Sequence, residues 1–205
     1  MSVWKKADGR QALSFLMGLS DVAKQLQVTT RSGRPVPPQK GFQLAVDLIA
    51  RAGREKKKLI LIGNGGSAAI ASHQAEDYWK NGGIEATAFN DASLLTCIAN
   101  DCGYENVFAV PMKQFARPGD VLIAISSSGK SPNILYGVRA AAQRGCRIIG
   151  FSGFHQTNPL RKMGDVNFYV PYQAYGLVEV SHLALIHSML REVIYINPNA
   201  AKKNC

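Results

Sequence analysis

LILIGNGGS, at residues 59–67, is the stretch that decides the fold. Its four leading apolar residues predict a buried β-strand that runs straight into a glycine-rich turn. The glycines permit positive φ angles and a close approach of the backbone to a ligand, and the helix predicted over 67–80 then presents unpaired N–H groups. The turn has neither the glycine spacing of a dinucleotide site nor the ending of a Walker loop. By itself this composition fits a ligand-binding loop and a plain turn equally well.

Strands and helices alternate along the rest of the chain. We expect strands at 59–62, 86–89, 121–125, 147–151 and 166–170, and helices at 67–80, 92–99, 132–144 and 175–195. This alternation predicts an α/β fold with a parallel sheet covered on both faces. Upstream, helices at 11–27 and from residue 42 flank a turn-rich linker at 29–41 that contains three prolines. The expected division is an N-terminal helix and linker (1–41), an α/β domain (42–195) and a frayed tail (196–205).

The composition is typical of one globular domain. The chain has 205 residues, of which 46% are hydrophobic and 19% charged, and this length suffices for a core without disulfides. No apolar run reaches the ~18 residues of a membrane helix, and the N-terminus lacks the apolar region of a signal peptide. Four cysteines (Cys97, Cys102, Cys146 and Cys205) show no metal-type spacing. We therefore expect reduced thiols in a cytoplasmic protein.

The net charge of +10 is concentrated towards the N-terminus. Residues 1–58 hold 12 Lys and Arg against 4 Asp and Glu, whereas residues 59–205 hold 12 against 10. Basic clusters of this kind are more often solvated helix ends than nucleic-acid sites. We expect neither a nucleic-acid nor a membrane partner. Attraction of an anionic, phosphorylated substrate is an equally good use of the charge.

A second polar loop, SSSGKSPN at 126–133, also leaves a predicted strand and enters a predicted helix. Pro132 suits the first helical turn because it has no N–H to leave unpaired. Hydroxyl groups, loop amides and a helix N-terminus together form a good phosphate cradle. Ligands of such sheets bind beyond the carboxyl ends of the strands. Two such loops in one sheet therefore favour a phosphorylated ligand, although a serine cap with a polar turn remains open for this loop alone.

Imidazoles and carboxylates form a candidate reactive group. His73 and Asp77 are four residues apart and share a helix face. Glu179 and His187, on the last helix, are eight residues apart, which places them about 12 Å apart along the axis. The four could hold Zn²⁺ or act as general acid and base, and the spacing alone does not decide between these roles. We interpret the remaining histidines, His155 and His182, as structural.

The sequence resembles the sugar isomerase (SIS) domain family, and within it the phosphoheptose isomerase type. The resemblance runs from about residue 40 to 195, and its strongest parts are ordered motifs: GNGGSAA at 63–69, IANDCGY at 98–104, RPGDVLIAISSSGKSPN at 117–133 and EVSHLALIH at 179–187. It implies a flavodoxin-like three-layer sandwich with a central parallel sheet and an N-terminal helical extension. It also implies a homo-oligomer, typically a tetramer with active sites at subunit interfaces.

The resemblance assigns roles residue by residue. The implied substrate-binding residues are Asn64, Gly65, Gly66, Ser67, Asp77, Asn100, Asp101, Ser126, Ser127, Ser128, Ser131 and Glu179. The implied ligands of one Zn²⁺ per subunit are His73, Asp77, Glu179 and His187. Three departures fall here: Asp77 replaces the family's catalytic glutamate, Glu179 replaces a glutamine, and Gly176-Leu177-Val178 stands where Asp-Arg-Ile is usual.

The implied activity is an aldose–ketose isomerisation that uses Asp77 and His187 as the catalytic acid and base. It would convert sedoheptulose 7-phosphate to D-glycero-D-manno-heptose 7-phosphate, in heptose biosynthesis, through an enediol. Two alternatives stay open. One is a non-catalytic SIS protein that binds a sugar phosphate or a replication-initiation partner, for which the N-terminal charge is the best argument. The other is an isomerase of a different phosphorylated sugar, to which the three departures would be adaptations.

Overall fold

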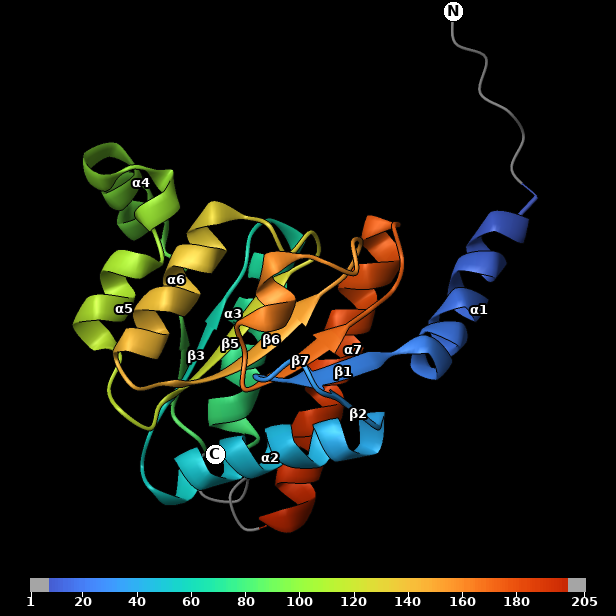
Figure 1. Cartoon of the computed structure of the whole chain (residues 1–205), viewed down its shortest axis with the longest axis horizontal. Helices are drawn as coiled ribbons and strands as arrows, with labels where there is room; N and C mark the ends of the chain where they lie inside the picture. Colours follow the sequence, from blue (N-terminus) through green and yellow to red (C-terminus); the bar gives the residue numbers. More distant parts are fainter. Residues whose placement is uncertain (1–7, 199–205) are drawn as a thin grey trace, which may run out of the picture.

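The computed structural model describes residues 8–198 and shows a sheet between two helical layers (Figure 1). The parallel strands of this sheet are β3 (Leu59–Ile62), β4 (Ala86–Ala88), β5 (Val121–Ser126), β6 (Arg147–Ser152) and β7 (Val166–Tyr169). All residues of β3, β5 and β7 are buried. Strands covered on both faces need continuous apolar runs, and this explains why LILI and VLIAI were recognisable in the sequence.

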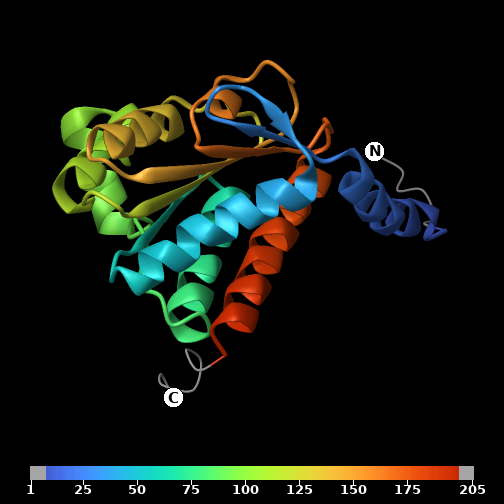
Figure 2. The same ribbon diagram turned by 60° about the horizontal axis from the view of Figure 1, so that its bottom comes forward.

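The helices divide between the two faces of the sheet, as Figure 2 shows from below. One face carries α2 (Pro38–Arg54), α3 (Gly66–Lys80) and α7 (Tyr175–Ile196), and the other carries α4 (Ala92–Cys102), α5 (Ala109–Phe115) and α6 (Pro132–Gln143). Side chains of a strand alternate between the faces. Leu59 and Leu61 accordingly join the core under α2, α3 and α7, whereas Ile60 and Ile62 join the core under α5 and α6. The predicted three-layer α/β fold is confirmed.

The strand order places two loops at one crevice. The sheet order is β2-β1-β7-β6-β5-β3-β4, so the chain passes from β3 outward to β4 and then returns to the other side of β3 as β5. The order therefore reverses between β3 and β5. In open α/β sheets, ligands bind at such a switch point, outside the carboxyl ends of the strands. The loops that leave β3 and β5 are 63–65 and 127–131, which lie within the two polar loops of the sequence.

The region expected to be a linker is part of the sheet. Strands β1 (Gln27–Thr30) and β2 (Pro35–Val36) form an antiparallel hairpin that overlaps 29–41, and β1 pairs antiparallel with β7. Expecting only a turn-rich linker there was wrong. Of the three prolines, Pro35 lies in the edge strand β2, where a missing N–H costs little, whereas Pro37 and Pro38 stand at the N-cap and first position of α2, which also need no N–H. Helix α2 begins at Pro38, so the expected boundary at residue 42 falls inside a helix.

The remaining elements lie around this core. Helix α1 (Arg10–Gln25) projects from the body and contacts α7 (Figure 1). Helix α5 and the short helices η1 (Tyr104–Asn106) and η2 (Pro159–Lys162) are elements that the sequence pattern did not predict. The last helix ends at Ile196, and most of the expected tail, with Cys205, lies outside the described residues. Within residues 8–198, no helix combines the length and apolar character that crossing a bilayer requires.

Candidate functional site

Two asparagines tie together the loops at the switch point. Asn64 Nδ2 donates a hydrogen bond of 2.9 Å to Asn133 Oδ1, and Asn133 Nδ2 donates one of 2.8 Å to Asn64 Oδ1. Gly65, next to this pair, has a φ of 55°, a backbone conformation that favours glycine. The reciprocal amide pair links the β3 loop to the start of α6, so the two loops form one wall.

The β5 loop encloses a small polar pocket of about 130 Å³. Ser126 Oγ accepts a 3.1 Å hydrogen bond from Gly129 N and lies 3.3 Å from Ser131 Oγ. Ser127 Oγ is buried and has no hydrogen-bond partner among the described residues. A buried hydroxyl without a partner is costly, and a ligand atom in the pocket would remove that cost. The pocket lining consists of Asn64, Ser67, Ile125, Ser126, Ser127, Ser128, Ser131, Tyr175 and Glu179.

Glu179 lies at this pocket. A Cβ on Gly66 would sit 2.6 Å from a carboxylate oxygen of Glu179, so the glycine makes room for that side chain. The set of metal-type donors that lie close together contains His73, Asp77 and His187 but not Glu179. Helix α7 thus presents Glu179 to the serine pocket and His187 to Asp77. The assignment of Glu179 as a metal ligand stays a prediction.

Asp77 lies between two imidazoles. Its Oδ2 is 3.4 Å from His73 Nε2, one turn earlier on α3, and 3.6 Å from His187 Nδ1 on α7. The two rings are edge to face, with centroids 5.4 Å apart. Asp77 is only 8% exposed, whereas both histidine side chains reach solvent. A carboxylate flanked by two accessible imidazoles is an arrangement suited to moving protons.

Two amides orient this group. Asn81 Nδ2 donates to Asp77 Oδ1 at 2.8 Å, which leaves Oδ2 facing the histidines. The side chain of Gln74 is buried, and its Nε2 atom is 3.3 Å from Asp77 Oδ2 and 3.0 Å from His187 Nε2. Because the carboxylate only accepts, the Gln74 nitrogen must point this way, so His187 Nε2 accepts and its Nδ1 carries the proton towards Asp77. Sequence reasoning missed Gln74 and Asn81, although both flank Asp77 at helical spacing.

The donor set fits a divalent cation. The ligand atoms of His73, Asp77 and His187 all lie within 4.8 Å of one another. A tetrahedral Zn²⁺ with ligands at about 2.1 Å separates its ligand atoms by about 3.4 Å, close to the contacts of Asp77. Gln74 Oε1 is buried and has no partner among the described residues. If the Gln74 amide turned over, this oxygen would face His187 Nε2 and accept the N–H that a metal-bound His187 would present there.

Asn100 and Asp101 lie outside the serine pocket of their own chain. They occupy the last turn of α4, are exposed, and bond to each other, with Asn100 Nδ2 2.8 Å from Asp101 Oδ1. Tyr104, which follows α4, reaches the site instead, because its hydroxyl donates to Asn64 Oδ1 at 3.3 Å. The proposed substrate contacts of Asn100 and Asp101 stay predictions.

His182 is a structural residue, as expected. It is fully buried on α7, and its Nε2 donates to the Ser152 carbonyl at 3.2 Å. Burial lowers its pKa from 6.5 to about 4, so the ring is neutral near pH 7. His155 is exposed on a loop. These two histidines belong to the scaffold and not to the reactive group.

Comparisons with known proteins identify the family. The family model of the SIS domain matches residues 38–153. The phosphoheptose isomerase of Geotalea daltonii is 35% identical over 174 residues, which are 82% of this chain and 89% of the relative. The phosphoheptose isomerase of Burkholderia pseudomallei is 38% identical over 155 residues, which are 73% of this chain and 76% of the relative.

Solved structures give the same result. Phosphoheptose isomerase GmhA from Neisseria gonorrhoeae superposes with a TM-score of 0.80 at 27% identity, covering 92% of this chain and all of that one. A phosphoheptose isomerase from Francisella tularensis, at 20% identity and a TM-score of 0.76, covers 92% of this chain and 98% of its own, and shows the shared fold. The sequence similarity and the fold together show that the chain belongs to the SIS domain family, among its phosphoheptose isomerases.

Proposed function

We propose that the chain is an aldose–ketose isomerase that converts sedoheptulose 7-phosphate to D-glycero-D-manno-heptose 7-phosphate. The observation that carries the proposal is the Asp77 carboxylate between His73 and His187, on α3 and α7, the two helices that also line the serine pocket at the switch point through Ser67 and Glu179. The similarity to proteins named phosphoheptose isomerase supports the same substrate. The reduced cysteines Cys97, Cys102 and Cys146 support our placing this activity in the cytoplasm.

The reaction moves one proton between neighbouring carbons. Asp77 Oδ2 removes the proton from C1 of the ketose and returns it to C2 of the enediol, which gives the aldose. His187 passes a proton between the two oxygens, so that O1 loses the proton that O2 gains. Asn81 holds the other carboxylate oxygen, and Gln74 holds His187 in the matching tautomer. General acid–base groups placed in this way contribute about 10²–10⁴-fold.

The sugar phosphate would bind across the two loops. In this proposal the phosphate occupies the pocket of Ser126, Ser127, Ser128 and Ser131, where hydroxyls and backbone amides at the start of α6 would donate hydrogen bonds to its oxygens. Asn64 and Ser67 line this pocket, and they would contact the sugar together with Gly65, Gly66, Asn100 and Asp101. Glu179, at the phosphate pocket, would bond to sugar hydroxyls and discriminate between substrates.

A zinc ion would be held by His73, Asp77 and His187, with Glu179 as the further ligand that the family resemblance implies. Such an ion supplies polarisation of the carbonyl oxygen when it is bound. The test is equilibrium dialysis with Zn²⁺ followed by metal analysis, which has a readout independent of turnover. We expect about one ion per chain, and less than a tenth of that for His73→Asn. Equal binding by the variant contradicts this ligand set.

The active protein is proposed to be a homo-oligomer, most simply a tetramer. Helix α1 supports this because it projects from the body and leaves Leu13, Leu16 and Met17 more than 60% exposed. An apolar group of this size on a projecting helix is typical of a subunit interface. Analytical ultracentrifugation of the full chain would measure the assembly. A monomer at micromolar concentration contradicts the proposal.

The deciding experiment follows hydrogen exchange in D₂O. The purified chain is incubated with sedoheptulose 7-phosphate, and deuterium entry at C1 and C2 is followed by NMR. We expect exchange at both carbons and formation of the aldose. Absence of exchange with every ketose phosphate of five to eight carbons contradicts the isomerase and favours a non-catalytic protein that binds a sugar phosphate or a replication-initiation partner.

A further inference from the structure

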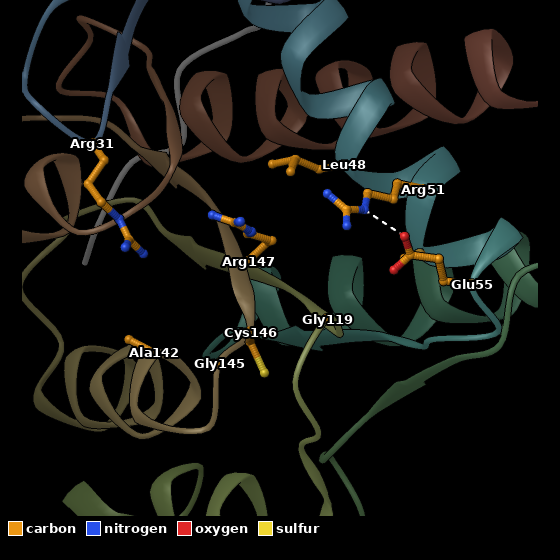
Figure 3. Close-up of a pocket in the computed structure, with 10 residues that line it drawn as sticks. Arg31, Leu48, Arg51, Glu55, Gly119, Ala142, Gly145, Cys146 and Arg147 are labelled. Carbon is orange, nitrogen blue, oxygen red and sulfur yellow. Dashed lines mark hydrogen bonds and ion pairs between the residues drawn. The ribbon is translucent and has the colours of Figure 1, made fainter.

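A second cavity lies at the opposite end of the sheet, where the parallel strands begin. It has a volume of about 410 Å³, and Arg31, Arg51 and Arg147 line it from three different elements (Figure 3). Arg147 is the first residue of β6, and Gly119, also in the lining, precedes β5. The serine pocket lies at the other ends of these strands, so the two sites are separated by the length of the sheet.

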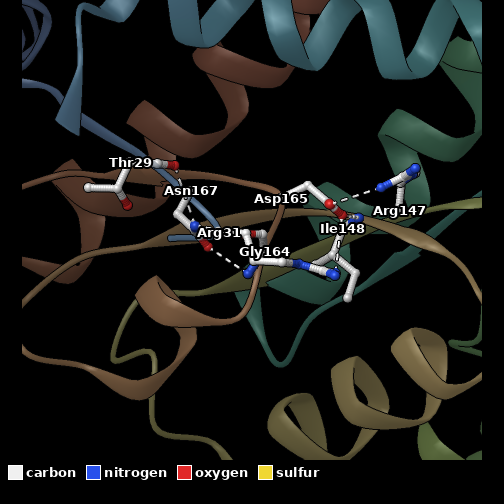
Figure 4. A network of polar contacts seen from close by, with 7 residues as sticks. All are labelled: Thr29, Arg31, Arg147, Ile148, Gly164, Asp165 and Asn167. Carbon is white, nitrogen blue, oxygen red and sulfur yellow. Dashed lines mark hydrogen bonds and ion pairs between the residues drawn. The ribbon is translucent and has the colours of Figure 1, made fainter. Parts of the chain in front are cut away.

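Asp165 positions two of the arginines. Its Oδ1 is 3.4 Å from Arg147 and its Oδ2 is 3.4 Å from Arg31, as Figure 4 shows. The backbone N–H of Arg31 also donates to the Asp165 carbonyl at 3.2 Å, and Ile148 N donates to Oδ2 at 2.8 Å. Each guanidinium has five N–H donors, and these two side chains remain 55% and 54% exposed. Asp165 therefore holds both arginines and leaves most of their donors unused.

The third arginine comes from α2. Arg51 Nε contacts Glu55 Oε1 at 2.7 Å, one turn along, and its side chain is 64% exposed. Three guanidinium groups thus face two carboxylates, and the cavity keeps a net positive charge. Cys146, also in the lining, adds no negative charge, because burial and the nearby Asp120 raise its pKa to about 11. Arg31 and Arg51 belong to the basic first 58 residues, so part of the N-terminal positive charge lies at this cavity.

We propose that this cavity binds a small polyanion with at least two phosphate groups, separately from the sugar-phosphate site. Its volume lies in the range of small-molecule sites, about 300–1,000 Å³. Guanidinium groups bind phosphate through paired hydrogen bonds, and three of them on separate elements suit more than one phosphate. The remaining lining is small or apolar, with Leu48, Ala52, Ala142 and Gly145. A concave cavity with its charges at the rim fits a compact ligand better than an extended nucleic acid.

The test is calorimetric titration of the full chain with inorganic pyrophosphate, in the presence of saturating sedoheptulose 7-phosphate. We expect one saturable site per chain that the sugar phosphate does not occupy, and binding of inorganic phosphate at least tenfold weaker. Arg31→Gln and Arg147→Gln should each weaken pyrophosphate binding about tenfold, since each removes a charge-assisted contact. Glu55→Gln should strengthen it severalfold, because it removes a competing carboxylate.

Arg139→Gln is the matched control, because Arg139 stacks on Tyr136 on the surface of α6, outside this cavity. It should leave pyrophosphate binding unchanged. Isomerase turnover should be unchanged in all four variants, which shows that they are folded. Three results would each overturn the proposal. They are the absence of saturable pyrophosphate binding, an affinity for pyrophosphate in Arg31→Gln and Arg147→Gln equal to that of the parent chain, and displacement of pyrophosphate by the sugar phosphate. Tighter binding of a DNA oligonucleotide, lost in Arg147→Gln, would also overturn it in favour of nucleic acid.

Discussion

The two ends of the sheet use different chemistry. At the carboxyl end, polar groups are buried and held by hydrogen bonds, as Gln74, Asp77 and Ser126 are, with 0%, 8% and 5% exposure. At the amino end, three arginine side chains stay more than half exposed in their ion pairs with carboxylates. Fixed, desolvated dipoles are effective where charge develops during a reaction. Exposed full charges suit recognition of an anion that carries its own charge. The difference indicates catalysis at one end and binding at the other.

The largest effect should follow from Asp77→Asn. The amide keeps the shape of the side chain and can still accept from Asn81, but it cannot remove a carbon-bound proton. We expect kcat to fall about 10²–10⁴-fold with little change in thermal stability. Turnover measured by NMR, together with a thermal melt, checks both parts. Glu76→Gln is the control, since Glu76 is the neighbouring carboxylate and pairs with Lys80 on the surface. Near-normal turnover in Asp77→Asn would contradict the base assignment.

The next effect is a loss of stability in mild acid. His182 is neutral in the fold, with a pKa of about 4, and regains a pKa near 6.5 when unfolded. The unfolded state therefore binds the proton first, so stability is complete above about pH 6.5 and falls as the pH drops towards 4. The expected loss between pH 7 and pH 5 is about 2 kcal/mol, measured by urea unfolding.

A matched pair of variants isolates this histidine. His182→Gln should show a shallower loss between pH 7 and pH 5, because the buried titrating group is gone. His155→Gln, which changes an exposed ring, should keep the parent's dependence. If both variants follow the parent curve, another group causes the pH dependence.

A smaller effect is expected from Ser127→Ala. The Ser127 hydroxyl has no partner among the described residues, so its removal should leave the free energy of unfolding unchanged. Loss of one hydrogen bond to a charged phosphate should raise KM about tenfold with kcat nearly constant. Steady-state kinetics measure both constants. Ser188→Ala is the control because that hydroxyl bonds within its own helix. An unchanged KM would place the phosphate elsewhere.

The smallest effect should appear in the stability of the amino end. Arg31→Gln breaks a pair in which the arginine side chain is 55% exposed, and exposed pairs contribute little. We expect the free energy of unfolding to change by less than about 1 kcal/mol in urea titrations. A loss above 2 kcal/mol would mean that these arginines hold the fold together, and the contrast between the two ends would then disappear.

Much of the fold was predictable because its signals are local. Strands such as β3 and β5 are recognisable in the sequence as apolar runs. Each polar loop directly follows its strand in the sequence. The β1–β2 hairpin was not predictable, because β1 pairs with β7, and Gln27 lies opposite Tyr169. Strands this short and rich in proline have no independent signal. Their stability comes from the sheet that they join.

The candidate site likewise has a part that the sequence predicted and a part that it did not. Residue types and order pointed to Asp77 and His187, and the two are in contact in the structure. Their orienting partner, Gln74, went unnoticed because its role depends on His187, which is 113 residues away. Glu179 and His187 lie on one helix, yet Glu179 lines the serine pocket and His187 contacts Asp77. Spacing along a helix gives a direction for each side chain but not the neighbour it meets.

The amino-acid sequence by itself determined the layered α/β fold, the two polar loops and the residue types of the reactive group. These follow from the periodicity of apolar residues and from the backbone conformations that glycine and proline favour. Only the tertiary structure decided that the loops meet, that Glu179 faces the serine pocket, and that three arginines line one cavity, two of them paired with Asp165. These contacts join residues far apart in the chain, so they exist only once the sheet has been assembled.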